Sequence, residues 1–321
     1  MEDLKTNFDL TEEQEMIRET VERFANEVVA PVAAHADETC TFNQDVWGQM
    51  CELGLPALPF PEEEGGAGLD NLSYIIAVEE LSRVCASTGL SYAAHVSLGT
   101  WPIHAFGSDA LKEKYMPGLC AGEFMGAYGL TEPNAGSDSG GTQTTAVLEG
   151  DHYLVNGSKC FITNGSFSKP YVITAQTDKS QGQKGIVALV VDRDTDGFSI
   201  EKGETKLGMR GSDWTNLVFQ DCKVPADNLL GTPETGFITF MKTLEGGRIS
   251  IGALSLGIAQ GALDQAVKYA NEREQFGKHL SKHQAVAFKL ADMRTEIAAA
   301  RHLVSHSARM KDAGRDYGTD A

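Results

Sequence analysis

The 321-residue chain carries 27 Lys and Arg against 45 Asp and Glu, which gives it a net charge of −18 at pH 7. A surface this acidic repels phosphate backbones, so nucleic-acid binding is disfavoured. Apolar residues make up 41% of the chain, enough for a sizeable core, which argues against global disorder. The length predicts about two domains at roughly 150 residues each.

The sequence indicates neither a secreted nor a membrane protein. Its first eleven residues are acidic and lack an apolar stretch, which argues against a secretory signal or a transit peptide. No apolar run approaches the length of a membrane span. The widely spaced cysteines form no C-x-x-C pair, so we predict reduced, mostly buried thiols in a cytoplasmic protein. They are Cys40, Cys51, Cys85, Cys120, Cys160 and Cys222.

Residues 1–122 have the pattern of a helical domain. Thr11 with Gln14 three residues later forms a capping box, which predicts that a helix begins there. A second helix is expected at 44–53, and Gly54 is expected to end it. Later helices are expected from Asn71 as an N-cap, at 87–104 and at 110–115.

Residues 123–234 change to a strand-like pattern. Short β-branched runs alternate with turn residues and no helix intervenes, which predicts an antiparallel β-barrel or sandwich. The Asn156-Gly157 pair is a strong signal for a hairpin turn. The expected strands are 144–148, 152–155, 159–163, 171–175, 186–191 and 217–219.

Residues 235–321 return to a helical pattern and predict two long antiparallel helices. The first covers 244–272 and is expected to break at Gly277, and the second covers 281–313. Two helices leave an apolar flank open, so a stable bundle needs more of them. We therefore expect a C-terminal helical bundle that is incomplete in this chain, in an α+β multidomain fold.

The loop from Tyr128 to Gly141 carries the strongest functional signal. It turns on Pro133 and Asn134 and then offers Gly136, Ser137 and a Gly140-Gly141 pair. Glycines let a backbone approach a ligand closely, and successive N–H groups with hydroxyls suit an anion or a polar cofactor edge. A generic run of Gly and Ser is more often a polar surface loop.

The order of residues in this loop resembles the N-terminal signature of the acyl-CoA dehydrogenase family. The match comprises Leu130-Thr131-Glu132, Gly136-Ser137-Asp138 and Gly141. The resemblance extends over essentially the whole chain, because the order of a helical domain, a small β domain and long helices is that of the family. It implies that the loop lies between a flavin and an acyl-CoA thioester.

The resemblance also implies site residues. FAD contacts are expected from Tyr128, Leu130, Thr131, Gly136, Ser137, Phe161, Ile162 and Thr163, and from Arg273, Phe276 and Gln284 of a neighbouring subunit. Substrate contacts are expected from Ser137, Glu245 and Arg248. Taken alone, 161–163 is a strand, Arg273 is a helix-end cation beside Glu272 or Glu274, and Arg248 is a partner in a surface salt bridge.

The catalytic base is the part of the family pattern that the chain lacks. Most members of the family place a Glu in a C-terminal part beyond Ala321, and a minority place it immediately before the Arg of the long helix. That position is Gly247 here, and Glu245 lies about 200° round the helix from it. The sequence therefore predicts a chain with no catalytic base of its own and no activity by itself.

The leading hypothesis is an FAD-dependent dehydrogenase that converts short-chain acyl-CoA to trans-2-enoyl-CoA in fatty acid β-oxidation. The resemblance implies an electron-transfer flavoprotein as acceptor, a homotetramer in the full-length form, and a bacterial cytoplasmic location. Two alternatives stay open: an acyl-CoA oxidase, and a non-catalytic protein that binds flavin and acyl-CoA. The His279/His283 and His302/His306 pairs lack a third ligand, so no metal is expected.

Overall fold

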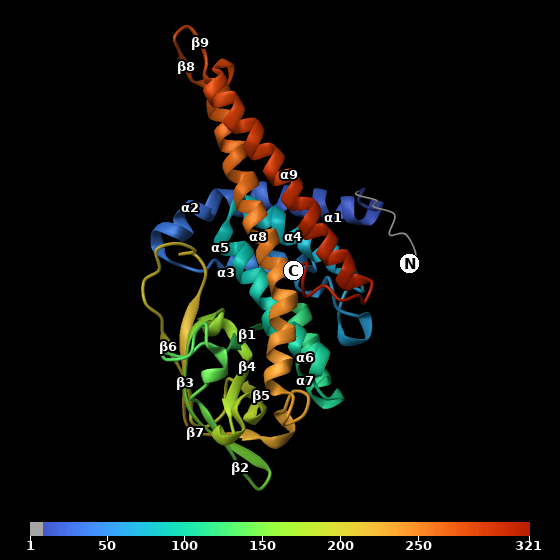
Figure 1. Cartoon of the computed structure of the whole chain (residues 1–321), viewed down its shortest axis with the longest axis vertical. Coiled ribbons are helices and arrows are strands. Elements are labelled where there is room, and N and C mark those ends of the chain that lie inside the picture. The colour runs from blue at the N-terminus through green and yellow to red at the C-terminus, as the bar shows by residue number, and fades with distance from the viewer. Residues whose placement is uncertain (1–8) are drawn as a thin grey trace.

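The structure, a computed structural model, describes residues 9–321. The prediction about the N-terminal stretch falls mostly on residues 1–8 and lies outside the described residues. Figure 1 shows a helical domain beside a β domain, with two long helices that cross the helical domain and project beyond it as a hairpin. This succession of helical, β and helical parts confirms the fold class predicted from the sequence.

The N-terminal domain contains seven α-helices among the described residues. They are α1 (Glu12–Phe24), α2 (Ala30–Thr39), α3 (Gln44–Glu52), α4 (Asn71–Val84), α5 (Ala86–Ala94), α6 (Trp101–Phe106) and α7 (Asp109–Ala121). The capping box of α1 is confirmed, because Thr11 Oγ1 accepts from the backbone N–H of Gln14 at 3.2 Å and Gln14 Oε1 accepts from that of Thr11 at 3.0 Å.

Two details of this domain differ from the prediction. The N-cap of α4 is Asp70, whose Oδ1 accepts from the N–H of Ser73 at 2.7 Å, and Asn71 is the first helical residue. The helical pattern over 87–104 is interrupted by a π-helical segment, His95–Thr100, between α5 and α6. Single π-helical turns inside helices occur frequently at functional sites.

The middle of the chain folds into one curled, seven-stranded sheet. Its strands are β1 (Met125–Gly129), β2 (Thr145–Glu149), β3 (His152–Thr163), β4 (Ser168–Gln176), β5 (Ile186–Asp192), β6 (Phe198–Lys202) and β7 (Trp214–Pro225). The order is β1-β4-β2-β3-β7-β6, with β5 paired to β4. β1 and β2 run parallel to β4, so the sheet is mixed rather than wholly antiparallel.

The hairpin turn predicted at Asn156-Gly157 is wrong. β3 runs straight through this pair, and the β2–β3 turn lies at Gly150 and Asp151, between the paired residues Glu149 and His152. Gly150 has φ +65°, which suits a tight turn. Gly157 instead marks a shift in the register of β3 against β7, as glycines in strands often do.

The C-terminal part confirms two long helices, α8 (Gly236–Glu272) and α9 (Gln284–Asp312). The short strands β8 (Glu274–Gln275) and β9 (Lys278–His279) join them at the projecting tip, where Gly277 has φ +74°. α8 thus ends before Gly277, which forms the turn of the hairpin. The segment 314–321 folds back, because Ser307 Oγ donates to the carbonyl of Asp320 at 2.6 Å.

The core has two large clusters of buried side chains. One fills the β domain. The other continues from the N-terminal helices into α8 through Phe240, Ile249 and Leu254. The six cysteines are free, with Cys120 and Cys222 buried. Within residues 9–321 no helix is long and apolar enough to cross a bilayer, and no three His, Cys, Asp or Glu side chains could together hold a metal.

Candidate active site at the junction of the domains

Two adjoining cavities lie where the helical domain, the β domain and α8 meet. The smaller, of about 180 Å³, is lined by Ala94, Leu98, Ala127, Tyr128, Leu130, Thr131, Phe161, Ile162, Thr163 and Leu244. The larger, of about 560 Å³, is lined by Leu90, Ala94, Ser97, Leu98, Thr163, Met241, Leu244, Glu245, Gly247, Arg248 and Ile251. Ala94, Leu98, Thr163 and Leu244 line both, so the two cavities share a wall. Together they collect most of the residues that the sequence singled out.

The π-helical segment that forms part of this wall is fixed by a buried histidine. The N–H of Gly126 donates to His95 Nδ1 at 3.1 Å, so His95 Nε2 carries the proton and donates to the carbonyl of Leu119 at 3.1 Å. Burial lowers the pKa of His95 to about 4, so the ring is neutral. Gly99 packs directly on Gly126, because a Cβ at Gly99 would lie 2.3 Å from the Gly126 backbone.

β1 contributes Tyr128 to the smaller cavity. Its ring stacks on Phe240 of α8 with centroids 4.4 Å apart, and its hydroxyl donates to the carbonyl of Phe240 at 3.0 Å. Burial raises the pKa of Tyr128 well above its usual value, so the phenol stays neutral. This contact fixes α8 against the β domain beside the cavity.

β3 contributes a bulge that presents Phe161. The pairing of β3 with β7 shifts between Lys159 and Ile162, and Phe161 has φ +63°, a conformation that side chains rarely adopt. Its side chain is 64% exposed and stacks on Trp214, with centroids 5.1 Å apart. Strained backbone of this kind is concentrated at functional sites, and here it presents an aromatic face.

The loop between β1 and β2 approaches the cavities only at its start. Leu130 and Thr131 line the smaller cavity, whereas Gly136 and Ser137 are exposed and line neither. A Cβ at Gly136 would meet nothing within 4 Å. The flavin and substrate contacts predicted for Gly136 and Ser137 therefore stay predictions.

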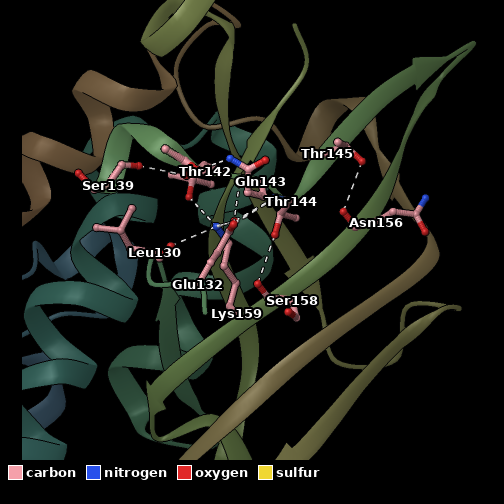
Figure 2. A network of polar contacts seen from close by, with 12 residues as sticks. Leu130, Glu132, Ser139, Thr142, Gln143, Thr144, Thr145, Asn156, Ser158 and Lys159 are labelled. Carbon is pink, nitrogen blue, oxygen red and sulfur yellow. Dashed lines mark hydrogen bonds and ion pairs between the residues drawn. The ribbon is translucent and has the colours of Figure 1, made fainter. Parts of the chain in front are cut away.

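A buried ion pair holds the two ends of this loop, as Figure 2 shows. Lys159 Nζ lies 2.7 Å from Glu132 Oε1, and the side chains are 0% and 3% exposed. Desolvation favours the neutral form of each group; it lowers the pKa of Lys159 to about 8, whereas the pKa of Glu132 stays below its usual value because Lys159 and N–H donors outweigh it. Sequence reasoning missed this pair, although Glu132 belongs to the matched motif.

α8 contributes a broad face to the larger cavity. Glu245 and Gly247 both line it, so their predicted separation of about 200° does not remove Glu245 from the site. The Glu245 carboxylate lies beside Gly318, and burial together with this nearby negative charge raises the pKa of Tyr317. Arg248 is exposed and forms no ion pair with the described residues, which leaves its guanidinium available to an anion.

The remaining predicted flavin residues lie elsewhere. Arg273, Phe276 and Gln284 are at the tip of the α8–α9 hairpin, at the opposite end of α8 from the β domain (Figure 1). All three are exposed, and Phe276 is 95% exposed. Neither Glu272 nor Glu274 forms an ion pair with Arg273 in the described structure. Within one chain these residues do not join the cavities.

Most of the chain matches the models of one protein family. Residues 11–123, 127–222 and 234–321 match the models of the acyl-CoA dehydrogenase N-terminal, middle and C-terminal domains. The chain is 51% identical to the short-chain specific acyl-CoA dehydrogenase of Clostridium acetobutylicum, over 98% of this chain and 83% of that protein.

Two solved structures are similar over nearly the whole chain. Butyryl-CoA dehydrogenase from Megasphaera elsdenii has a TM-score of 0.95 and 44% identity, and the match covers 98% of this chain and 83% of that one. A structure described as the electron transferring flavoprotein of Acidaminococcus fermentans, in work on flavin-based electron bifurcation, has a TM-score of 0.96 and 49% identity with the same coverage.

Proposed function

This chain belongs to the acyl-CoA dehydrogenase family of oxidoreductases, and we propose that it binds FAD together with a short-chain acyl-CoA thioester. The reaction served is α,β-dehydrogenation to the trans-2-enoyl-CoA, with an electron-transfer flavoprotein as the acceptor. The observation that carries the proposal is the pair of cavities that share a wall at Thr163 and Leu244. One cavity takes the flavin ring and the other takes the acyl chain.

The family is FAD-dependent, and the smaller cavity has the features that a flavin ring requires. Leu130 and Ile162 give apolar surface, and Phe161 presents an exposed ring face. The hydroxyls of Thr131 and Thr163 have no hydrogen-bond partner within the described chain, so both are available to the polar edge of a cofactor. When bound, the flavin supplies the hydride acceptor, and the protein supplies position and electrostatics.

The larger cavity suits a short acyl thioester. Most of its lining is aliphatic, from Leu90, Leu98, Met241 and other side chains, and Arg248 lies where an anionic CoA moiety can pair with it. Dehydrogenation also requires a base for the α-proton and donors that polarise the thioester carbonyl. The short-chain preference is supported by the relatives named above.

We propose that no catalytic base lies among residues 9–321. Glu245 is the one carboxylate among the cavity-lining residues of this range, and it is directed towards Tyr317 and Gly318. Gly247 occupies the position at which some family members carry the base. We accordingly expect this chain by itself to bind FAD and substrate without turnover. A non-catalytic protein that binds flavin and acyl-CoA would behave in the same way.

An anaerobic titration with butyryl-CoA, followed by flavin absorbance, tests this proposal. The chain is expected to show a shifted flavin spectrum without bleaching. Gly247→Glu is expected to bleach, because a carboxylate then faces the cavity; a Cβ at Gly247 would lie 3.0 Å from Leu98 Cδ2, a flexible side chain that can move. Bleaching of the unmodified chain that disappears in Glu245→Gln would show instead that Glu245 is the base. Peroxide formed in air by a competent variant would identify an oxidase.

We also propose a homo-oligomer, a tetramer, in which the hairpin tip of one chain completes the flavin site of another. The support is the exposure of Arg273, Phe276 and Gln284 far from the cavities of their own chain. Exposed apolar side chains continue along the hairpin at Tyr269 and Phe288, as is common where another chain packs. Analytical ultracentrifugation at several concentrations tests the assembly.

Two further points stay proposals. A cytoplasmic location is supported by the bacterial relatives. A division into domains 1–122, 123–234 and 235–321 is supported by a core cluster made only of middle-domain residues, although the other large cluster joins the N-terminal helices, α8 and Val172, Ala188 and Val190 of the sheet.

A further inference from the structure

The buried pair Glu132–Lys159 joins the start and the end of the loop between β1 and β2 (Figure 2). We propose that this pair is a positioning device for FAD: it closes the base of the 133–143 loop and thereby fixes Leu130 and Thr131 against the flavin. The proposal rests on the proposed function, because it assigns FAD to the smaller cavity. Neither side chain touches that cavity, so both act through the residues they hold.

Glu132 closes the loop by accepting hydrogen bonds from its far end. Oε2 accepts from the backbone N–H of Gln143 at 2.6 Å, and Oε1 accepts from that of Thr144 at 3.1 Å. One carboxylate thus fixes residues eleven and twelve positions further along the chain. The N–H of Glu132 also donates to the carbonyl of Ala135 at 3.0 Å, which sets the first turn of the loop.

Lys159 connects this base to the sheet and to the cavity wall. Besides Glu132, its ammonium donates to the carbonyl of Leu130 at 3.2 Å and to Thr174 Oγ1 of β4 at 2.9 Å. An ammonium has three N–H groups, and these three acceptors satisfy all of them. The neighbouring N–H of Cys160 donates to the carbonyl of Thr131 at 2.9 Å. Both cavity residues of the loop are therefore held through β3.

The rest of the loop has little else to hold it. Among the described residues, no hydrogen bond links 136–140 to another element. Inside the loop, the N–H of Gly141 donates to the carbonyl of Asp138, Thr142 Oγ1 donates to that of Ser139, and Gln143 Nε2 donates to that of Gly141. Beyond the base, Lys179 Nζ donates to Gln143 Oε1 at 2.9 Å, in an exposed position. The course of the loop is consequently set at its base.

A buried ion pair contributes little net free energy to the stability of a fold. Taking two charges out of water costs several kcal/mol per ion, and well-packed apolar replacements are often neutral or stabilising. What such a pair can supply is one defined arrangement, because any displacement leaves buried charges and N–H groups without partners. A positioning role can therefore be distinguished from a merely structural one. If the role is positioning, replacing both charges is expected to lower FAD affinity more than it lowers the stability of the fold.

The test uses Glu132→Gln, Lys159→Met and the double variant, each compared with Glu64→Gln. Glu64 is also largely buried, at 12% exposed, and its carboxylate lies 2.6 Å from His104 Nδ1 and 3.2 Å from Lys112 Nζ, but it belongs to the helical domain and lines neither cavity. Three quantities are measured in each protein: the unfolding midpoint, the Kd for FAD from flavin fluorescence, and amide hydrogen exchange resolved by segment.

Each single variant is expected to raise exchange in 133–144 and the Kd for FAD by about tenfold or more, with exchange elsewhere unchanged well below the unfolding midpoint. The double variant is expected to regain stability relative to the singles while FAD affinity stays low. Glu64→Gln is expected to lower stability without a local effect on the loop or on FAD.

Uniformly faster exchange across the chain, or FAD affinity that returns with stability in the double variant, would overturn the positioning role. So would an unchanged Kd in Glu132→Gln. If the unmodified chain binds no FAD, the proposed function fails by that result. The closure of the loop is then judged by exchange alone, and unchanged exchange in 133–144 would refute it.

Discussion

The two halves of α8 lie in different surroundings although they form one continuous helix. The inner half, 236–257, crosses the N-terminal helices and lines the cavities with Met241, Leu244 and Ile251. The outer half, 258–272, leads to the projecting tip and exposes Val267 and Tyr269. The inner half is therefore stabilised by burial within the chain, while the outer half packs on α9 along one side, through Leu263, and exposes apolar side chains elsewhere.

One continuous helix therefore combines a buried half with a half that exposes apolar side chains. Where the helix is buried, its sequence is constrained by packing, and Gly257 lies against the backbone of α4. Where it is exposed, its residues are available to another molecule, as large exposed apolar patches generally are. We therefore expect substitutions in the inner half to affect folding and substitutions in the outer half to affect assembly.

The largest contrast is expected from two Phe→Ala substitutions. Phe240→Ala removes a fully buried ring that stacks on Tyr128, and a loss of about 3–5 kcal/mol is expected. Phe276→Ala removes a ring that is 95% exposed, so stability should change by less than about 0.5 kcal/mol. Urea unfolding of both variants measures the difference. Equal losses would show that the tip is part of the folding unit.

The second expected effect is a pH dependence of stability that arises from His95, in the π-helical segment against which the inner half of α8 packs. Burial lowers the pKa of His95 from 6.5 to about 4, so the unfolded chain binds the proton more tightly. The stability that depends on neutral His95 is fully present above pH 6.5 and falls as the pH drops towards 4, by about 3 kcal/mol in total.

His95→Gln should remove this part of the pH dependence between pH 6.5 and 4, although the variant is less stable at neutral pH because its buried partners are less well satisfied. His35→Gln, at an exposed position of α2, is the matched control and should keep the slope. Urea midpoints at several pH values provide the measurement. A slope that persists unchanged in His95→Gln would exclude this histidine as its source.

A smaller effect is expected from two glycines of α8. A Cβ at Gly257 would lie 2.3 Å from the Glu79 carbonyl of α4, so Gly257→Ala should cost about 2 kcal/mol through displacement of the helix pair. A Cβ at Gly252 would lie 3.2 Å from Val304 Cγ2, which can move slightly, and the helical preference of alanine then favours the variant by up to about 1 kcal/mol. Thermal unfolding of the two variants shows whether Gly252→Ala is the more stable of them, as expected.

The smallest effect on stability, with a clear effect on binding, is expected at Arg273. Its exposed side chain has no ion pair in the described structure, so Arg273→Ala should leave the unfolding midpoint unchanged. FAD affinity of the assembled protein should fall by about tenfold if the guanidinium binds phosphate of the cofactor. Lys268→Ala, at another exposed position of α8, controls for loss of positive charge. Equal FAD affinity in both variants would argue against the role of the tip.

Local signals in the sequence predicted local structure well. The Thr11 and Gln14 capping box was identified correctly because both partners lie within four residues of each other. The turn at Asn156-Gly157 was predicted wrongly because the pairing of β3 with β7 overrides the preference of the dipeptide and continues the strand.

Contacts between distant residues could not be predicted in the same way. Glu132 and Lys159 are separated by 27 positions, and only the folded sheet brings their charges together. The helical wheel placed Glu245 and Gly247 correctly relative to each other, but it gave no measure of how wide the cavity-lining face is. The resemblance to a family pointed to some residues that line the cavities, such as Tyr128 and Phe161. It did not point to Leu90, Leu98 or Met241, and Gly136 and Ser137 lie outside the lining.

The contact between Gly99 and Gly126 has a consequence for how this site can change during evolution. Because main chain meets main chain there, no side chain can be inserted between the π-helical segment and β1 without moving one of them. Mutation can therefore reshape the cavities through lining side chains such as Leu90 or Met241, while the packing of the π-helical segment on β1 behind them stays the same. New substrate preferences are therefore expected to arise from changes in the lining side chains, while the backbone contact between Gly99 and Gly126 stays the same.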